Sequence, residues 1–172
     1  MIRDIVVYPD KRLKAVSKEV IDFNSSLHVL LDDMYETMVA KNGVGLAAIQ
    51  IGVDLRVLII NIPIKDKEKG QGQPKDNTLE VINPIFLEEE GKSRYEEGCL
   101  SVPGYYEYVD RYKKVKIEYQ DRNGIKHTIE DDDFLSIAIQ HEIDHLNGRV
   151  FIEKLSILKR KKFEKEWKNR KS

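Results

Sequence analysis

The sequence predicts an α+β fold: a compact mixed domain in which antiparallel sheets surround a buried central helix, and a further helix ends the chain. Strand and helix patterns are mixed along the chain and do not alternate strictly, and residues 131–148 are apolar on more than one helical face. With 172 residues and 41% hydrophobic content, the chain can bury one sizeable core. We therefore expect a single domain over residues 1–172.

The first expected helix follows Asn24. Either Asn24 or Ser25 is a suitable N-cap, and Asn42-Gly43 is a suitable end. The apolar residues between them recur on one helical face: Leu27, Leu30, Leu31, Met34 and Met38.

Two strands are expected next, separated by a loop. Residues 55–62 (LRVLIINI) are rich in β-branched residues and too few for a confident helix, which indicates a largely buried strand. Residues 65–77 (KDKEKGQGQPKDN) are polar and are expected to form a solvated loop. Residues 78–87 then read as a strand that Pro84 interrupts or places at an edge.

A hairpin and a buried helix are expected in the second half of the chain. Apolar and polar residues alternate over 115–119 and again over 125–130, and the turn dipeptide Asn123-Gly124 lies between them. Residues 131–148 begin with three acids suited to a helix N-terminus and end in Asn147-Gly148. Because the interior of this segment is so apolar, we expect a helix in the core.

That helix carries the sequence HEIDH, from His141 to His145. Residues four apart lie one above the other on a helix, so both imidazoles can reach one metal ion, and Glu142 between them can address a water at that ion. The alternative is a pair of hydrogen-bonded core histidines beside an exposed acid. Because the two histidines have the spacing of metal ligands, metal binding is the favoured interpretation. Asp144 is either a hydrogen-bond partner for an imidazole N–H or an ordinary surface acid.

A catalytic site of this kind needs a third protein ligand, and two candidates exist. Glu164 follows His145 at a tolerable spacing and would make the protein a zinc endopeptidase, although it lies in a lysine-rich tail. Cys99 would add a soft, negatively charged donor, and the nearby Gly98 allows close backbone approach. An isolated cysteine is otherwise a small buried hydrophobe. A binding module that keeps a metal only for structure is a further alternative.

Charge and composition indicate neither DNA nor membrane as a partner. Lys and Arg number 29 against 30 for Asp and Glu, which gives a formal charge of −1. The N-terminal residues have no apolar h-region, so we expect no secretory signal, and the longest apolar stretch, from Val57, is too short to cross a bilayer. A single cysteine cannot form an internal disulfide. We expect a soluble, cytoplasmic protein.

Three separated motifs resemble those of the peptide deformylases. They are GVGLAAIQ at 43–50, EGCLS at 97–101 and QHEIDH at 140–145. Their order and spacing agree with that family, and the resemblance covers nearly the whole chain. A phosphate-binding role for the first motif is set aside, because no Lys, Ser or Thr stands where such a loop would need one.

The resemblance implies a hydrolase that removes the N-terminal formyl group from formyl-methionyl nascent polypeptides. Cys99, His141 and His145 match the metal ligands, and Fe²⁺ is the metal expected in the cell, with Zn²⁺, Ni²⁺ or Co²⁺ as alternatives. Glu142 matches the general base and acid that assists a metal-bound water as it attacks the formyl carbon. Gln50 and the backbone N–H of Leu100 match the donors that stabilise the developing oxyanion.

The resemblance also implies how the peptide binds. The backbone near Val44, Gly45 and Gly98 is expected to align the substrate as an additional strand. The methionine side chain is expected to enter an apolar pocket lined by Val44, Phe134, Ile137 and Ala138. The sequence departs from the family at Tyr106, where many bacterial members have an arginine that helps to hold the peptide backbone. A tyrosine hydroxyl cannot replace a guanidinium fork.

The last segment, KRKKFEKEWKNRKS, contains eight basic and two acidic residues. Ser156 can cap a helix over about 156–172, on which Lys161, Lys165 and Lys168 share one face. A solvated helix with Glu164–Lys168 and Glu166–Arg170 pairs is one interpretation. Because the substrate of the family emerges from the ribosome and bacterial relatives dock there through a basic C-terminal helix, ribosome binding is the other.

Overall fold

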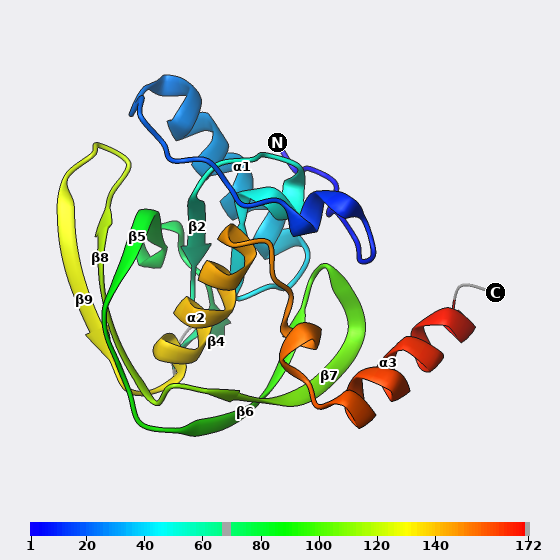
Figure 1. Ribbon diagram of the computed structural model, residues 1–172. Coiled ribbons are helices and arrows are strands. Elements are labelled where there is room, and N and C mark those ends of the chain that lie inside the picture. Colours follow the sequence, from blue (N-terminus) through cyan, green and yellow to red (C-terminus); the bar gives the residue numbers. More distant parts are fainter. Residues whose placement is uncertain (67–69, 171–172) are drawn as a thin grey trace.

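The computed structural model describes residues 1–66 and 70–170 of the chain (Figure 1). It has the mixed α+β architecture expected from the sequence. The main sheet has five strands in the order β1-β2-β5-β8-β9, and every neighbouring pair is antiparallel. Its strands are β1 (Gly45–Ala47), β2 (Val57–Ile60), β5 (Leu79–Glu90), β8 (Lys114–Gln120) and β9 (Lys126–Asp131).

Strand β2 is buried on both faces because a helix covers each of them. Helix α1 (Ser25–Ala40) packs on the face that carries Val57 and Ile59, and α2 (Phe134–Leu146) packs on the face that carries Leu58 and Ile60. All four strand residues are at most 1% exposed. The continuous apolar run in the sequence therefore reflects burial on both sides, as in strands that have no solvent face. Figure 1 shows α2 at the centre of the molecule.

Most of the expected elements are confirmed. The side chain of Asn24 accepts a hydrogen bond from the backbone N–H of Leu27 at 3.1 Å and caps α1. Strands β8 and β9 form the expected hairpin, and Gly124 in its turn has a φ of +79°. Strand β5 changes register between Ile82 and Ile85, which is where Pro84 cannot donate to the ladder. This strand also extends past the expected end at residue 87, to Glu90.

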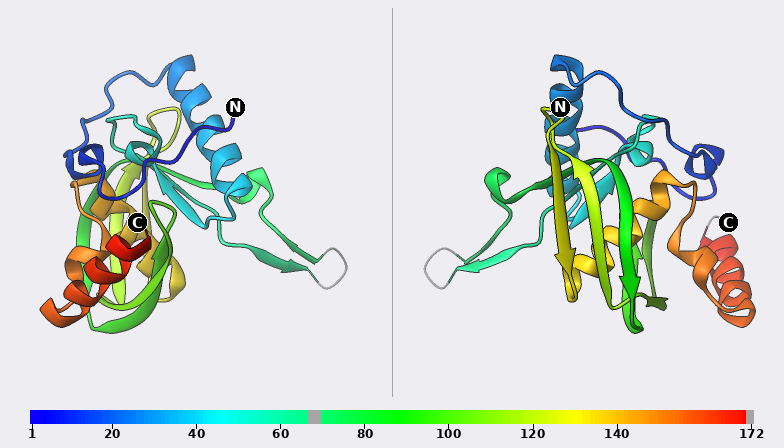
Figure 2. Two further views of the ribbon diagram at one scale, coloured as in Figure 1. Left: turned by 90° about the vertical axis from the view of Figure 1, so that its right-hand side faces the viewer. Right: turned by 60° about the vertical axis from the view of Figure 1, so that its left-hand side comes forward.

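The loop expected over residues 65–77 is wrong in part. Strands β3 (Ile64–Asp66) and β4 (Gly70–Gly72) pair there, and a 3₁₀ helix covers Lys75–Asn77; residues 67–69 lie outside the described residues. Figure 2 shows the pair of strands projecting from the body of the molecule. Because the pair is short and polar and contains two glycines, it has no alternating apolar pattern by which a strand could be recognised.

A second hairpin was not expected. Strands β6 (Ser93–Cys99) and β7 (Val102–Arg111) pair antiparallel, and the turn between them lies at Leu100 and Ser101. The dipeptide Pro103-Gly104, which is typical of a turn, belongs to β7. Gly104 has a φ of +75°, so the turn signal at that dipeptide reflects a local bend within the strand.

The C-terminal helix α3 (Ile157–Arg170) is basic and begins after Ser156, whose Oγ accepts a hydrogen bond from the backbone N–H of Lys159 at 3.3 Å. Its buried residue is Phe163, which packs against Tyr8 and Tyr105 with ring centroids 5.5 and 4.6 Å away. An apolar contact therefore holds this helix on the body of the protein. Among the described residues, no helix is both long and apolar enough to cross a membrane.

Candidate metal centre

Helix α2 carries the central residues of the candidate site. Its N-terminus is fixed by Asp131, whose Oδ2 accepts hydrogen bonds from the backbone N–H groups of Asp133 and Ser136 at 2.9 and 2.8 Å. At its C-terminal end, Gly148 has a φ of +74°, and a Cβ there would come within 2.3 Å of the backbone oxygen of Lys14. Only glycine fits this end of the helix, because any side chain would collide with backbone.

Two imidazoles of α2 meet the thiol of Cys99. The ligand atoms of Cys99, His141 and His145 all lie within 4.8 Å of one another, and within residues 1–66 and 70–170 this is the only such group of three. Cys99 Sγ is 3.4 Å from His145 Nε2. A tetrahedral metal with ordinary zinc-like bond lengths would place sulfur and nitrogen about 3.6 Å apart. The donor set and its spacing therefore fit one metal ion.

The neighbours of the two imidazoles shift their pKa values in opposite directions. Burial and then the charges of His141 and Arg111 lower the pKa of His145 well below its usual value, and its Nδ1 finds no partner among the described residues. Burial also lowers the pKa of His141, but Cys99 and Glu97 beside it raise that pKa well above its usual value. The site thus favours positive charge next to Cys99, which a divalent cation would supply.

Glu97 orients His141 from the opposite side. Its Oε1 lies 2.7 Å from His141 Nδ1, so the imidazole donates from Nδ1 and keeps Nε2 as a ligand. Arg111 donates to both oxygens of Glu97 at 2.8 Å and to Asp144 Oδ2 at 2.6 Å. Although burial alone would raise the pKa of Glu97, Arg111 and His141 lower it to about 2. The carboxylate is therefore charged at neutral pH.

Sequence reasoning missed both Glu97 and Arg111 as site residues. Asp144 was expected either to bind an imidazole or to be an ordinary surface acid, and it does neither, because it pairs with Arg111. Arg111 is 6% exposed and stands 14 residues after Glu97. Had the pairing of β6 with β7 been predicted, it would have indicated this ion pair, because a buried arginine in that hairpin requires a carboxylate partner.

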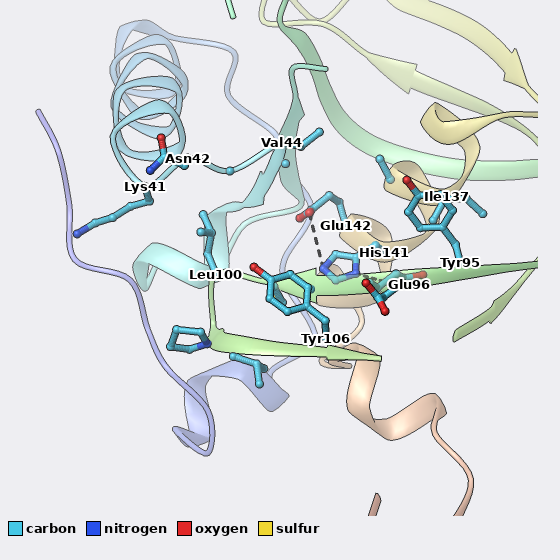
Figure 3. Close-up of a pocket in the computed structure, with 18 of the residues that line it drawn as sticks. Lys41, Asn42, Val44, Tyr95, Glu96, Leu100, Tyr106, Ile137, His141 and Glu142 are labelled. Carbon is cyan, nitrogen blue, oxygen red and sulfur yellow. Dashed lines mark hydrogen bonds and ion pairs between the residues drawn. The ribbon is translucent and has the colours of Figure 1, made fainter. Parts of the chain in front are cut away.

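Glu142 lies beside the three ligands. It is 5% exposed, and its Oε1 is 3.9 Å from His141 Nε2 (Figure 3). Its Oε2 finds no hydrogen-bond partner among the described residues. Burial is the main reason why the pKa of Glu142 rises to about 7. An exposed acid beside two core histidines is therefore excluded, and the raised pKa suits a group that accepts and returns a proton near neutral pH.

Strand β1 makes room for this carboxylate. A Cβ at Gly45 would lie 2.6 Å from Glu142 Oε1 and 3.0 Å from its Cδ. Gly45 therefore allows the backbone of an edge strand to approach the acid directly.

Gln50 points inward, and its amide is held in place. Its Oε1 accepts from the backbone N–H of Ala47 at 2.9 Å, which orients the Nε2 group toward Ser101 Oγ at 3.1 Å and Cys99 Sγ at 3.4 Å. The side chain is 1% exposed, so it is a buried amide next to the ligand sulfur. Leu100 follows Cys99 directly, in the turn that leads into β7.

These groups open onto a cavity of about 540 Å³. It is lined by the ligands Cys99 and His141, by Glu142 and by Leu100, and His145 and Gln50 lie buried behind it. The expected substrate-binding residues also line it: Val44, Gly45, Gly98, Phe134, Ile137 and Ala138. The structure thus brings together side chains that the sequence placed in three separate motifs. Glu164, the rival third ligand, is exposed on α3 and pairs with Arg160 at 3.5 Å.

Comparison with known proteins gives one consistent match. Residues 2–161 match the family model described as polypeptide deformylase. The chain is 58% identical over 165 residues to a peptide deformylase from Helicobacter pylori, which covers 96% of this chain and 92% of that protein.

Two solved structures extend the match to the fold. A peptide deformylase from Legionella pneumophila has a TM-score of 0.88 and 40% identity, and covers 99% of this chain and 96% of its own. A Met-Ala-Ser-bound class I type b peptide deformylase from Acinetobacter baumannii has a TM-score of 0.81 and 31% identity. The match covers 90% of this chain and 99% of that one.

Proposed function

This chain belongs to the polypeptide deformylase family, and we propose that Cys99, His141 and His145 bind its metal ion while Glu142 acts as general base and acid. The protein is a metal-dependent hydrolase that removes the N-terminal formyl group from nascent polypeptides. The observation that supports the assignment of residues is that three ligand atoms lie within 4.8 Å of one another, at a cavity lined by Cys99, His141 and the buried carboxylate of Glu142.

Glu142 moves the proton in this reaction. A divalent cation held by the three side chains would supply Lewis acidity to the attacking water and to the formyl oxygen. Glu142 accepts a proton from that water as its oxygen attacks the formyl carbon, and then gives the proton to the amine nitrogen as the C–N bond breaks. Its pKa of about 7 allows both directions of transfer at neutral pH.

Gln50 and Leu100 stabilise the oxygen that gains negative charge. The amide of Gln50 is oriented before substrate arrives, because Ala47 holds its oxygen and Ser101 and Cys99 lie next to its nitrogen. The backbone N–H of Leu100 is the second donor. Donors that are already in place cost no reorganisation during the reaction, which makes them effective in the transition state.

The substrate peptide binds between two strands. Strand β1 is an edge of the main sheet, and β6 forms part of the opposite wall of the cavity. Backbone groups near Val44, Gly45 and Gly98 would pair with the peptide as with a neighbouring strand, so many sequences can bind. The methionine side chain enters the apolar part of the cavity formed by Val44, Phe134, Ile137 and Ala138.

The metal in the cell is proposed to be Fe²⁺, although Zn²⁺, Ni²⁺ and Co²⁺ suit the same Cys-His-His donors. We expect metal-loaded protein to release formate from formyl-Met-Ala-Ser, and chelation to abolish this activity. Because an oxidisable metal and a thiolate share the site, activity of the Fe²⁺ form should fall on exposure to air, and the Ni²⁺ form should keep its activity. Formate assays over several hours in air measure both; an iron form that is equally durable would contradict the assignment of iron.

The protein is proposed to act in the cytoplasm as a single domain over residues 1–172. Its substrates arise at the ribosome, and the thiol of Cys99, which is needed as a ligand, is unpaired. A reducing compartment would preserve that thiol.

Helix α3 is proposed to bind the ribosome. Phe163 and Trp167 face the body of the protein, which leaves the basic side chains Lys161, Lys162, Lys165 and Lys168 exposed. Such a row of lysines suits the phosphate backbone of ribosomal RNA.

Replacing Lys161, Lys162, Lys165 and Lys168 with alanine should weaken ribosome binding and make its salt dependence shallower, because phosphate contacts are lost. Hydrolysis of formyl-Met-Ala-Ser should be unchanged, since these side chains lie outside the cavity. Co-sedimentation with ribosomes at several salt concentrations measures affinity and slope. A control variant removes the same charge at four other exposed lysines: Lys11, Lys14, Lys92 and Lys113. If both variants bind ribosomes like the wild type, or lose binding equally, α3 is not the docking helix.

A further inference from the structure

Tyr106 covers Gly98 at the mouth of the cavity. The two residues are direct partners across β6 and β7. A Cβ at position 98 would lie 2.4 Å from Tyr106 Cε1 and 2.6 Å from its Cδ1, so the ring rests on the glycine itself. An aromatic ring that covers a cross-strand glycine is held in a defined orientation. Tyr106 is nevertheless 65% exposed, which leaves much of the ring open toward the cavity that it lines.

The ring lies on the face of the hairpin that points away from α2. Side chains alternate between the two faces of a strand. In β6, Tyr95 contacts Phe134 of α2 with ring centroids 5.4 Å apart, and Glu97 binds His141 of the same helix. Gly98 follows Glu97 directly and therefore belongs to the opposite face, together with its partner Tyr106. Figure 3 shows the ring projecting toward the cavity, with its hydroxyl on the side of Leu100.

A peptide that binds beside β6 as an additional strand has the same alternation. If the methionine side chain points toward Phe134, Ile137 and Ala138 of α2, the next side chain points to the face that carries Tyr106. Gly98 contributes no side chain on that face, so the ring of Tyr106 covers the glycine and itself lines the cavity there.

We propose that Tyr106 forms a wall of the subsite for the residue that follows the methionine, and that it selects large apolar side chains there. The inference rests on the proposed function and on strand-like binding of the peptide. A tyrosine offers an apolar ring face, which gains from contact with apolar groups, and it cannot hold peptide carbonyls with the fork of a guanidinium. Recognition at this point shifts from the backbone of the substrate to its second side chain.

The test compares formyl-Met-Leu-Ser with formyl-Met-Ala-Ser on the same metal-loaded protein. We expect kcat/KM of the wild type to favour leucine by about 10-fold, the low end of the range for added methylene groups in an apolar pocket, since the subsite is partly open to solvent. Tyr106→Ala should bring the ratio close to unity, and Tyr106→Phe should keep it. Tyr108→Ala is the matched control, because Tyr108 is exposed on the same face of the hairpin but does not line the cavity.

A purely structural role for Tyr106 would change both substrates equally and leave their ratio unaltered. Binding of the product peptides Met-Leu-Ser and Met-Ala-Ser, measured by calorimetry, provides a second readout that does not depend on turnover, and the same preference is expected there. Should Tyr106→Ala fail to fold, Tyr106→Arg keeps a long side chain over Gly98 and should also lose the preference.

Two results would overturn the inference: equal kcat/KM for the two substrates in the wild type, or an unchanged ratio in the folded Tyr106 variants that lack the ring. Absence of formate from both substrates is a different result, since it would contradict the proposed function itself.

Discussion

Replacing Glu142 with alanine is expected to lower kcat for formyl-Met-Ala-Ser by at least ~10²-fold while the metal stays bound, as is typical when a general acid–base group is lost. Glu142 is the buried carboxylate beside the ligands, and its Oε2 has no other partner among the described residues. Without it, the attacking water and the leaving amine lose the carboxylate that lies beside the metal ligands to carry their proton. The three metal ligands are untouched, so metal content should match the wild type.

Glu142→Gln is the matched variant for this prediction. It keeps the shape of the side chain next to Gly45 and removes only its ability to accept a proton, so its kcat should fall as far as that of the alanine variant. Formate release and metal analysis on the same preparations separate loss of the base from loss of the metal. Near-normal turnover in either variant would place the base on another residue.

The metal ligands on α2 could be predicted because their spacing is local. His141 and His145 lie four residues apart in a segment whose apolar pattern identifies a helix, so geometry brings the two rings together whatever the rest of the chain does. Cys99 joins them only through the path of β6, and its role depended on the resemblance of three motifs to a known family. The structure now brings its sulfur within 3.4 Å of His145.

The polar contacts behind His141 could not be predicted, for a physical reason. They join Arg111, at the end of β7, to Glu97 of β6 and to Asp144 of α2. Such contacts depend on which strands pair, and the β6–β7 hairpin contains Pro103 and a positive-φ Gly104, which read as a turn. The burial of β2 was easier to predict, because a continuous run of apolar residues indicates a buried strand whichever helices cover it.

The packing of the C-terminal helix on the body of the protein could not be predicted from the composition of the tail. Its lysines suggested a solvated helix with Glu164–Lys168 and Glu166–Arg170 pairs. In the structure, Glu164 pairs with Arg160, and Arg170 donates to the backbone oxygens of Pro103 and Gly104, both at 3.1 Å. Phe163 is fully buried and fixes the helix on the body. Two aromatic residues among many charges were too weak a signal to predict this docking.

Replacing Cys99 with alanine is expected to remove both the metal and nearly all activity. The remaining imidazoles would offer two ligands where a catalytic site of this type uses three, and the negative charge of the thiolate would be lost with the sulfur. Burial keeps His145 neutral, which is the form that ligates a metal, but two neutral imidazoles supply no negative charge to offset a divalent cation. Glu97 is not free to replace the thiolate, because Arg111 and His141 bind its carboxylate.

Glu164→Ala is the matched variant, because Glu164 is the third ligand in the alternative zinc endopeptidase. The decisive measurement is the metal-to-protein ratio of the wild type, Cys99→Ala and Glu164→Ala after identical loading and desalting. With Cys99 as ligand, the wild type and Glu164→Ala should each retain about one equivalent of metal, as expected for a three-ligand site, and Cys99→Ala should retain close to none. Full metal in Cys99→Ala with loss only in Glu164→Ala would contradict the metal centre described here.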